Sequence, residues 1–165
     1  MKRVTLFRHA KSSWDNEKLS DHDRPLSARG RRDAPRMGER LAKRGLAPTL
    51  LLTSSAVRAR QTAKLIAPAL TNAKLATRIE PRIYLASPGQ LFAILADVED
   101  SVDELVLVGH NPGLTELANR LLPDLALDNL PTAGAVAIDC AMDSWSGIDA
   151  GPFTLRFHDY PKNKG

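Results

Sequence analysis

The chain has 165 residues and a formal net charge of +4 at neutral pH, which suits one compact domain over residues 1–165. Aromatic residues make up only 5% of the chain, which favours helices packed on a sheet over an all-β sandwich. No apolar run approaches the roughly 18 residues that cross a bilayer, and charge appears too early for a secretory signal. The single cysteine, Cys140, has no partner within the chain. We therefore expect a cytoplasmic protein without membrane contacts.

Short apolar runs along the chain predict the strands of a sheet. The runs at 4–7, 49–53 and 105–108 are apolar on both faces, as a parallel sheet covered by helices requires. Two further runs near the C-terminus, at 135–140 and 153–157, predict two more strands.

Helical periodicity fills the segments between the predicted strands. Apolar residues recur at spacings of three and four over 59–70, 91–98 and 114–122. Ser87 before Pro88 and Asn111 before Pro112 are typical of helix starts. A further amphipathic segment covers 27–43, where Pro35 predicts a kink or an interruption. The alternation predicts a three-layer α/β/α sandwich around a central, mostly parallel sheet, which is an α/β fold.

Polar residues follow three of the predicted strands, where ligands bind in such sheets. Arg8 and His9 end the first run, Ser54 and Arg58 follow the second, and His110 follows the third. Parallel strands would bring these residues to one edge. Arginine offers a fork of donors that matches phosphate oxygens, and a neutral imidazole is a competent nucleophile toward phosphorus. The pattern therefore predicts a site for phosphoryl transfer.

Other phosphatase chemistries do not fit the chain. A Cys-x5-Arg loop fails because Ser146 stands six residues after Cys140, and Asp21 and Asp23 do not follow an apolar strand. There is no Gly-x4-Gly-Lys-Ser/Thr loop and no His-Glu-x-x-His motif. The four histidines contain no i, i+4 pair, so we expect neither a metal nor another cofactor.

Three motifs resemble those of the histidine phosphatase superfamily, also called the phosphoglycerate-mutase-like fold. Leu-Phe-Arg-His-Ala-Lys-Ser-Ser-Trp-Asp at 6–15 is similar to its Arg-His-Gly-x-Ser-x-Trp-Asn pattern, with Ala10 in place of glycine and Asp15 in place of asparagine. Ser-Ser-Ala-Val-Arg-Ala-Arg-Gln-Thr at 54–62 is similar to Ser-x-x-x-Arg-Ala-x-x-Thr, and Gly109-His110 is similar to its late Gly/Ser-His pair. The short length, Asp-Arg-Pro-Leu at 23–26 and Gly-His-Asn-Pro at 109–112 resemble the SixA-type phosphohistidine phosphatases.

The resemblance implies a role for each matching residue. His9 would accept the phosphoryl group, and Arg8, Arg58 and His110 would complete the phosphate pocket. Asp15 stands where relatives bind phosphate with an asparagine, and it and Asn111 are expected near the substrate. Glu80 is the only carboxylate in the stretch 80–90, where relatives that cleave phosphate esters place a general acid.

The predicted function is a phosphatase that works through a covalent phosphohistidine on His9. Its expected partner is a phosphoprotein carrying phosphohistidine. The alternatives are a small-molecule phosphatase or mutase on the same fold, and a non-catalytic module that binds acidic protein or nucleic acid through basic residues. Those residues form a stripe, interpreted mainly as a solvated face, of Arg29, Arg32, Arg36, Arg40 and Lys43. Aromatic residues are not interleaved with them, so we expect no nucleic-acid partner. The oligomeric state stays open.

Overall fold

A computed structural model of the chain describes residues 1–70 and 74–163 and contains a six-stranded sheet. The strands are β1 (Lys2–Arg8), β2 (Leu50–Thr53), β3 (Ala76–Ile79), β4 (Glu104–Gly109), β5 (Ala135–Cys140) and β6 (Phe153–Asp159). They lie in the order β3-β2-β4-β1-β5-β6. The pairs β3–β2, β2–β4 and β4–β1 are parallel, whereas β5 and β6 are antiparallel to their neighbours. The expectation of a mostly parallel sheet is confirmed.

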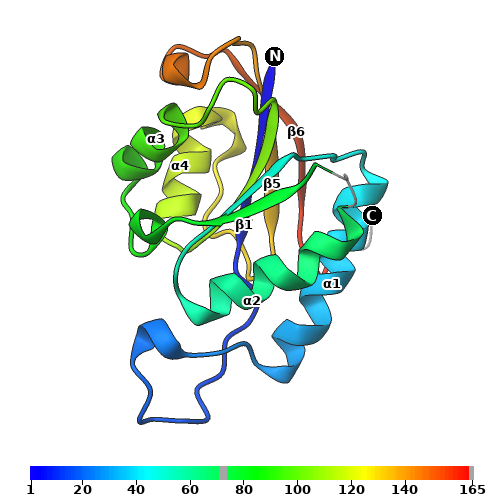
Figure 1. The fold of residues 1–165 in the computed structure, drawn as a ribbon, viewed down its shortest axis with the longest axis vertical. Helices are drawn as coiled ribbons and strands as arrows, with labels where there is room; N and C mark the ends of the chain where they lie inside the picture. The colour runs from blue at the N-terminus through cyan, green and yellow to red at the C-terminus, as the bar shows by residue number, and fades with distance from the viewer. Residues whose placement is uncertain (71–73, 164–165) are drawn as a thin grey trace.

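Helices cover both faces of the sheet, as the three-layer prediction requires. Figure 1 shows α1 (Ala28–Lys43) and α2 (Val57–Ile66) on one side, and α3 (Pro88–Ala96) and α4 (Gly113–Leu121) on the other. The Ser27 side chain accepts a hydrogen bond from Gly30 N and starts α1. Ser87 and Gln90 form a capping box at the start of α3. Pro112 directly precedes α4 and does not occupy its first turn. Of the two helices expected to begin with a proline in the first turn, only α3 does so.

Two apolar clusters separate the layers, because successive residues of a strand point to opposite faces. One cluster packs against α3 and α4 and takes from the strands Val4, Leu6, Leu50, Leu52, Leu105 and Leu107. The other packs against α1 and α2 and takes Phe7, Leu51, Val106 and Val108. The runs that looked apolar on both faces therefore serve two cores at once.

Of the kink or interruption expected at Pro35, the interruption is absent, and one strand was not predicted. The helix α1 runs without interruption from Ala28 to Lys43 across Pro35, since Pro35 removes only one backbone donor and the helix is anchored by its buried face. The strand β3 has no apolar run, because all four of its residues are exposed. It is held by backbone pairing with β2 at the edge of the sheet.

The basic stripe of α1 is only partly a solvated face. Arg40 donates to the buried carboxylate of Asp159 at 2.6 Å, and Arg44 donates to the same carboxylate at 3.1 Å. Arg29 pairs with Asp33, whereas Arg32 and Arg36 are exposed. The C-terminal end of α1 is thus tied to the end of β6.

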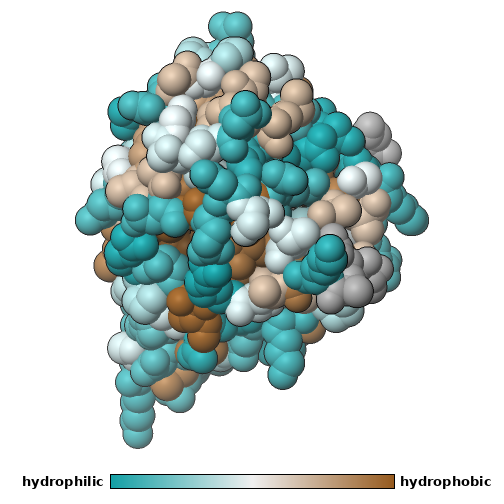
Figure 2. Space-filling view, turned by 45° about the horizontal axis from the view of Figure 1, so that its top comes forward, coloured by the Kyte–Doolittle hydropathy of each residue, from teal (hydrophilic) through white to brown (hydrophobic). Residues whose placement is uncertain are grey.

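Two further expectations concern the single cysteine and contact with membranes. Cys140 is buried in β5, and this burial raises the pKa of its thiol to about 12. Among residues 1–70 and 74–163, every helix is too short or too polar to cross a lipid bilayer. The face drawn in Figure 2 is largely hydrophilic, and its apolar areas are small and separated.

The close approach of α1 to α2 gives a test of this packing. A Cβ atom at Gly38 would lie 2.9 Å from the carbonyl oxygen of Ile66, so Gly38→Ala forces the two helices apart. We expect it to lower the free energy of unfolding by about 1–3 kcal/mol in urea denaturation. The matched control is Gly147→Ala, whose Cβ would meet nothing within 4 Å. Equal effects of the two substitutions would contradict the packing described.

Candidate active site

The parallel strands end side by side and bring the three polar clusters together. Arg8 is the last residue of β1 and pairs in register with Gly109, the last residue of β4. Thr53 of β2 pairs with Val108 of β4. The residues that follow these strands line a cavity of about 240 Å³. Its lining is Arg8, His9, Lys11, Ser12, Trp14, Arg24, Arg58, Leu85, His110, Asn111 and Thr132.

His9 is held in one tautomer. Its Nδ1 lies 2.7 Å from the carbonyl oxygen of Ala10, and a carbonyl can only accept, so Nδ1 carries the proton. The lone pair is therefore on Nε2. The side chain is only 6% exposed. Burial, together with the charges of Arg58 and Arg8, lowers the pKa of His9 to about 4. The imidazole is neutral at physiological pH, and the electron pair on Nε2 accepts a hydrogen bond from Arg58 Nε.

Arg58 lies between His9 and the carboxylate of Asp21. Its Nε is 3.4 Å from His9 Nε2. Its two terminal nitrogens donate to Asp21, one to the backbone oxygen at 2.6 Å and one to Oδ2 at 3.0 Å. This fork fixes the plane of the guanidinium next to the imidazole lone pair.

Arg8 brings a second, half-buried guanidinium to the cavity. One terminal nitrogen donates to the carbonyl oxygen of Leu130 at 3.0 Å. The Nε atom is buried and has no hydrogen-bond partner among the described residues. Desolvation and the neighbouring charge of Arg58 lower the pKa of Arg8, although an arginine stays charged. An unpaired buried donor is costly, so a bound anion would satisfy it.

His110 is oriented by the residues that follow β2. Its Nε2 lies 2.7 Å from Ser54 Oγ, and Ser54 Oγ accepts from the backbone nitrogen of Ala56 at 3.2 Å. If the hydroxyl donates to Nε2, both groups are satisfied and the His110 proton is on Nδ1. Nδ1 is buried without a partner among the described residues. Burial lowers the pKa of His110 to about 3. In that tautomer, Nδ1 of the neutral ring is a second donor without a partner, and the ring centroid lies 5.1 Å from that of His9.

A carboxylate that the sequence interpretation set aside lies at the edge of the cavity. Asp21 accepts from Tyr84 Oη at 2.6 Å and from Arg24 at 3.0 Å, in addition to Arg58. The hydrogen bond from Tyr84 and those from the arginines lower the pKa of Asp21 to about 2. Asp21 is therefore an ionised counter-charge that holds the arginines.

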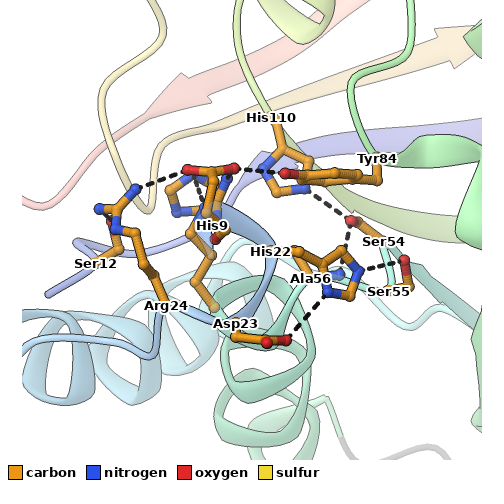
Figure 3. Close-up of polar contacts among 12 residues, drawn as sticks. His9, Ser12, His22, Asp23, Arg24, Ser54, Ser55, Ala56, Tyr84 and His110 are labelled. Atoms are coloured by element: carbon orange, nitrogen blue, oxygen red, sulfur yellow. Dashed lines mark hydrogen bonds and ion pairs between the residues drawn. The ribbon is translucent and has the colours of Figure 1, made fainter. Parts of the chain in front are cut away.

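Tyr84 and His22 form the wall next to Asp21. The Tyr84 ring meets His110 and His22 edge to face, at 5.4 Å and 4.8 Å between centroids. Figure 3 shows the His22 ring between Ser55 and Asp23, with Tyr84 beside His110. Sequence reasoning missed Asp21, Arg24 and Tyr84 as site residues. Only the Asp-Arg-Pro-Leu segment at 23–26 gave a signal for Arg24.

The structure places the remaining expected residues in different ways. Asn111 lines the cavity, but its side chain bonds Asn129, Thr115 and the Leu130 carbonyl. Asp15 is exposed and is not among the lining residues. Glu80 accepts three hydrogen bonds from Arg82 and does not line the cavity either. Of the expected carboxylates, neither reaches the cavity.

Metal ligands are not clustered in this site. Across the two described stretches of the chain, no three histidine, cysteine or carboxylate side chains are grouped as a metal ion requires. Positive charge in the cavity comes from Arg8, Arg24, Arg58 and Lys11. A cavity with this surplus of cationic donors around a neutral imidazole suits a phosphate group, and the class of protein that it defines is a phosphatase.

Similarity to known proteins gives the family. A sequence model of the histidine phosphatase superfamily (branch 1) matches residues 4–84. An uncharacterized protein of Mycobacterium tuberculosis is 33% identical over 162 residues, which are 92% of this chain and 98% of the relative. An uncharacterized chloroplastic protein of Arabidopsis thaliana is 34% identical over 152 residues, which are 87% of this chain and 69% of the relative. The chain belongs to the histidine phosphatase superfamily.

Solved structures agree with this placement. A protein of Agrobacterium tumefaciens assigned as the phosphohistidine phosphatase SixA superposes with a TM-score of 0.83 at 28% identity, covering 97% of this chain and 98% of its own. The protein histidine phosphatase SixA complexed with tungstate has the same fold, with a TM-score of 0.79 at 21% identity and coverage of 96% and 97%. The resemblance to SixA-type proteins is confirmed at the level of fold and superfamily.

Two adjacent serines provide a test of the His110 geometry. Ser54→Ala removes the hydroxyl that orients His110, and we expect kcat/KM for an aryl phosphate to fall about tenfold, as for one lost hydrogen bond. Ser55→Ala removes a hydroxyl that contacts His22, and we expect near-normal activity. Equal losses for both variants would mean that the Ser54 contact does not position His110.

The buried histidines also predict how stability depends on pH. The pKa of His9 is lowered from 6.5 to about 4, so between these values the unfolded chain binds a proton that the folded chain does not. The free energy of unfolding therefore falls as the pH drops from 6.5 toward 4. We expect His9→Gln to reduce this slope by up to about 1.4 kcal/mol per pH unit, measured by urea unfolding. Identical slopes in both proteins would contradict a neutral, buried His9.

Proposed function

We propose that the protein hydrolyses phosphohistidine in a protein partner through a covalent phosphohistidine on His9. The observation that carries the proposal is the His9 Nε2 lone pair, 3.4 Å from Arg58 Nε in a cavity of cationic donors. Nε2 attacks phosphorus, and the bond from phosphorus to the leaving nitrogen breaks with its electron pair going to that nitrogen. Water then attacks the phosphorus of phospho-His9, which releases inorganic phosphate and restores the imidazole.

The donors of the cavity have distinct proposed tasks. Arg58 stabilises the charge on the phosphoryl oxygens as it moves from the leaving group to His9. The unpaired Nε of Arg8 and Nδ1 of His110 bind the remaining oxygens. Since these groups supply the positive charge, we propose that no metal takes part.

The lining of the cavity favours substrates whose leaving group departs without a general acid from the protein. No aspartate or glutamate is among the described lining residues, and Asp21 at its edge is ionised, with its pKa at about 2. An alkoxide needs a proton as it departs, and general acid help is worth about 10²–10⁴ in rate. An imidazole is protonated readily near neutrality, which favours phosphohistidine over an alkyl phosphate.

One assay series tests the mechanism and the leaving group together. In the presence of a chelator, we expect kcat/KM to be high for a phosphohistidine peptide and an aryl phosphate. For phosphoserine and alkyl phosphates we expect values lower by about 10² or more. His9→Ala should abolish turnover, whereas His158→Gln, which lies on β6 and does not line the cavity, should not. A rapid quench with radiolabelled substrate should leave an acid-labile, base-stable label on the wild-type protein only.

Three results would contradict the proposal. Activity of His9→Ala close to that of the wild type would exclude the covalent step. Loss of activity with the chelator, restored by a divalent ion, would show that a metal is needed. Equal turnover of alkyl phosphate and phosphohistidine would favour a small-molecule phosphatase, a function that the same fold has in a mycobacterial glucosyl-3-phosphoglycerate phosphatase with a TM-score of 0.68.

A further inference from the structure

A second cavity adjoins the catalytic cavity. It has a volume of about 280 Å³. Three residues, Leu85, His110 and Asn111, line both cavities. The rest of its lining is Ala86, Ser87, Gln90, Pro112, Gly113 and Glu116. A ligand in the catalytic cavity that contacts these shared residues can therefore also contact the second cavity.

Leu85 stands at the boundary between the two cavities. It is 70% exposed, and its φ is 57°, in the left-handed region that a leucine seldom adopts. A strained backbone is kept where the surrounding structure enforces it, commonly at ligand sites. The result is an apolar side chain presented to solvent directly beside the phosphate pocket.

The backbone around the second cavity is tightly packed. A Cβ atom at Gly113 would lie 2.3 Å from the carbonyl oxygen of Ala86, so the start of α4 touches the segment before α3. The capping box of Ser87 and Gln90 fixes the start of α3. The cavity is thus bounded by the first turns of α3 and α4 and is already formed in the free protein.

The second cavity differs in charge from the first. Glu116 is the one charged residue in its described lining. Its side chain is exposed and has no hydrogen bond or ion pair among the described residues. The catalytic cavity, by contrast, contains four cationic side chains. A ligand that spans both cavities would therefore match them with a phosphate at one end and a positive charge at the other.

We propose that the second cavity is a subsite for the polypeptide that bears the phosphohistidine, with an apolar contact on Leu85 and a basic side chain at Glu116. The inference rests on the proposed function and adds the preferred sequence around the phosphorylated residue. A peptide suits the subsite because Leu85, Pro112 and Glu116 are all exposed, which leaves the chain room to enter and leave.

Matched phosphohistidine peptides test the subsite. One set varies the residue two places before the phosphohistidine among Lys, Gln and Glu, and a second set varies the residue two places after it. For one of the sets, we expect the wild type to favour the Lys peptide over the Glu peptide in kcat/KM by about two- to fivefold, the range of an exposed ion pair. Glu116→Gln should remove the preference, and Glu116→Lys should reverse it.

The controls separate the subsite from the catalytic step. Glu39→Lys makes the same charge change at another exposed carboxylate, on α1, and should keep the wild-type order of peptides. All variants should hydrolyse an aryl phosphate at the wild-type rate, since Glu116 does not line the catalytic cavity. Equal rates for the three peptides of both sets would overturn the subsite while leaving the proposed function in place. Hydrolysis of the aryl phosphate with none of any peptide would instead overturn the phosphohistidine substrate, and the subsite with it.

Discussion

The parallel, in-register pairing of β1, β2 and β4 is the constraint on which the site depends. Arg8 pairs with Gly109, and Thr53 pairs with Val108, so the residues that follow each strand leave the sheet at one level. A slip of one residue would turn every side chain to the opposite face and would place apolar residues where the cavity now lies. The two apolar cores prevent such a slip, since each strand supplies side chains to both. The geometry of the site is therefore held by packing remote from it.

The cavity contains more positive than negative charge, and this excess governs the chemistry that its geometry allows. The buried Arg58 and the half-buried Arg8 lie beside two neutral histidines, and Asp21 is the carboxylate that pairs with Arg58 and Arg24. Burial, together with the charges of the arginines, raises the cost of protonating the imidazoles and keeps His9 neutral. The same excess of positive charge attracts a phosphate, whose oxygens would satisfy the donors left unpaired. The arginines thus contribute both to keeping His9 neutral and to the attraction of an anion.

Most strands and several site residues could be predicted from the sequence, because they are signalled by short stretches of neighbouring residues. The apolar runs predicted the strands, and the polar residues directly after them, Arg8, His9 and His110, followed from the rule on strand ends. Other features depend on long-range contacts that leave no periodic pattern. Asp21 and Tyr84 are 63 residues apart and meet only through the folding of two loops, and β3 has no apolar run because it pairs as an exposed edge strand.

In the proposed function, the residues that sequence reasoning missed affect selectivity more than the basic reaction. With Tyr84, Arg24 and Arg58 all donating to it, Asp21 is too weak a base at neutral pH to carry a proton to a departing alkoxide. The hydrogen bonds that hold the arginines in place therefore also remove the nearest carboxyl group from acid catalysis. Under the proposed function, a substrate with a good leaving group is favoured, and a positive charge beside that group would lie near Glu116 in the adjoining cavity. The proposed choice of substrate thus follows from the same hydrogen bonds that hold the arginines in place.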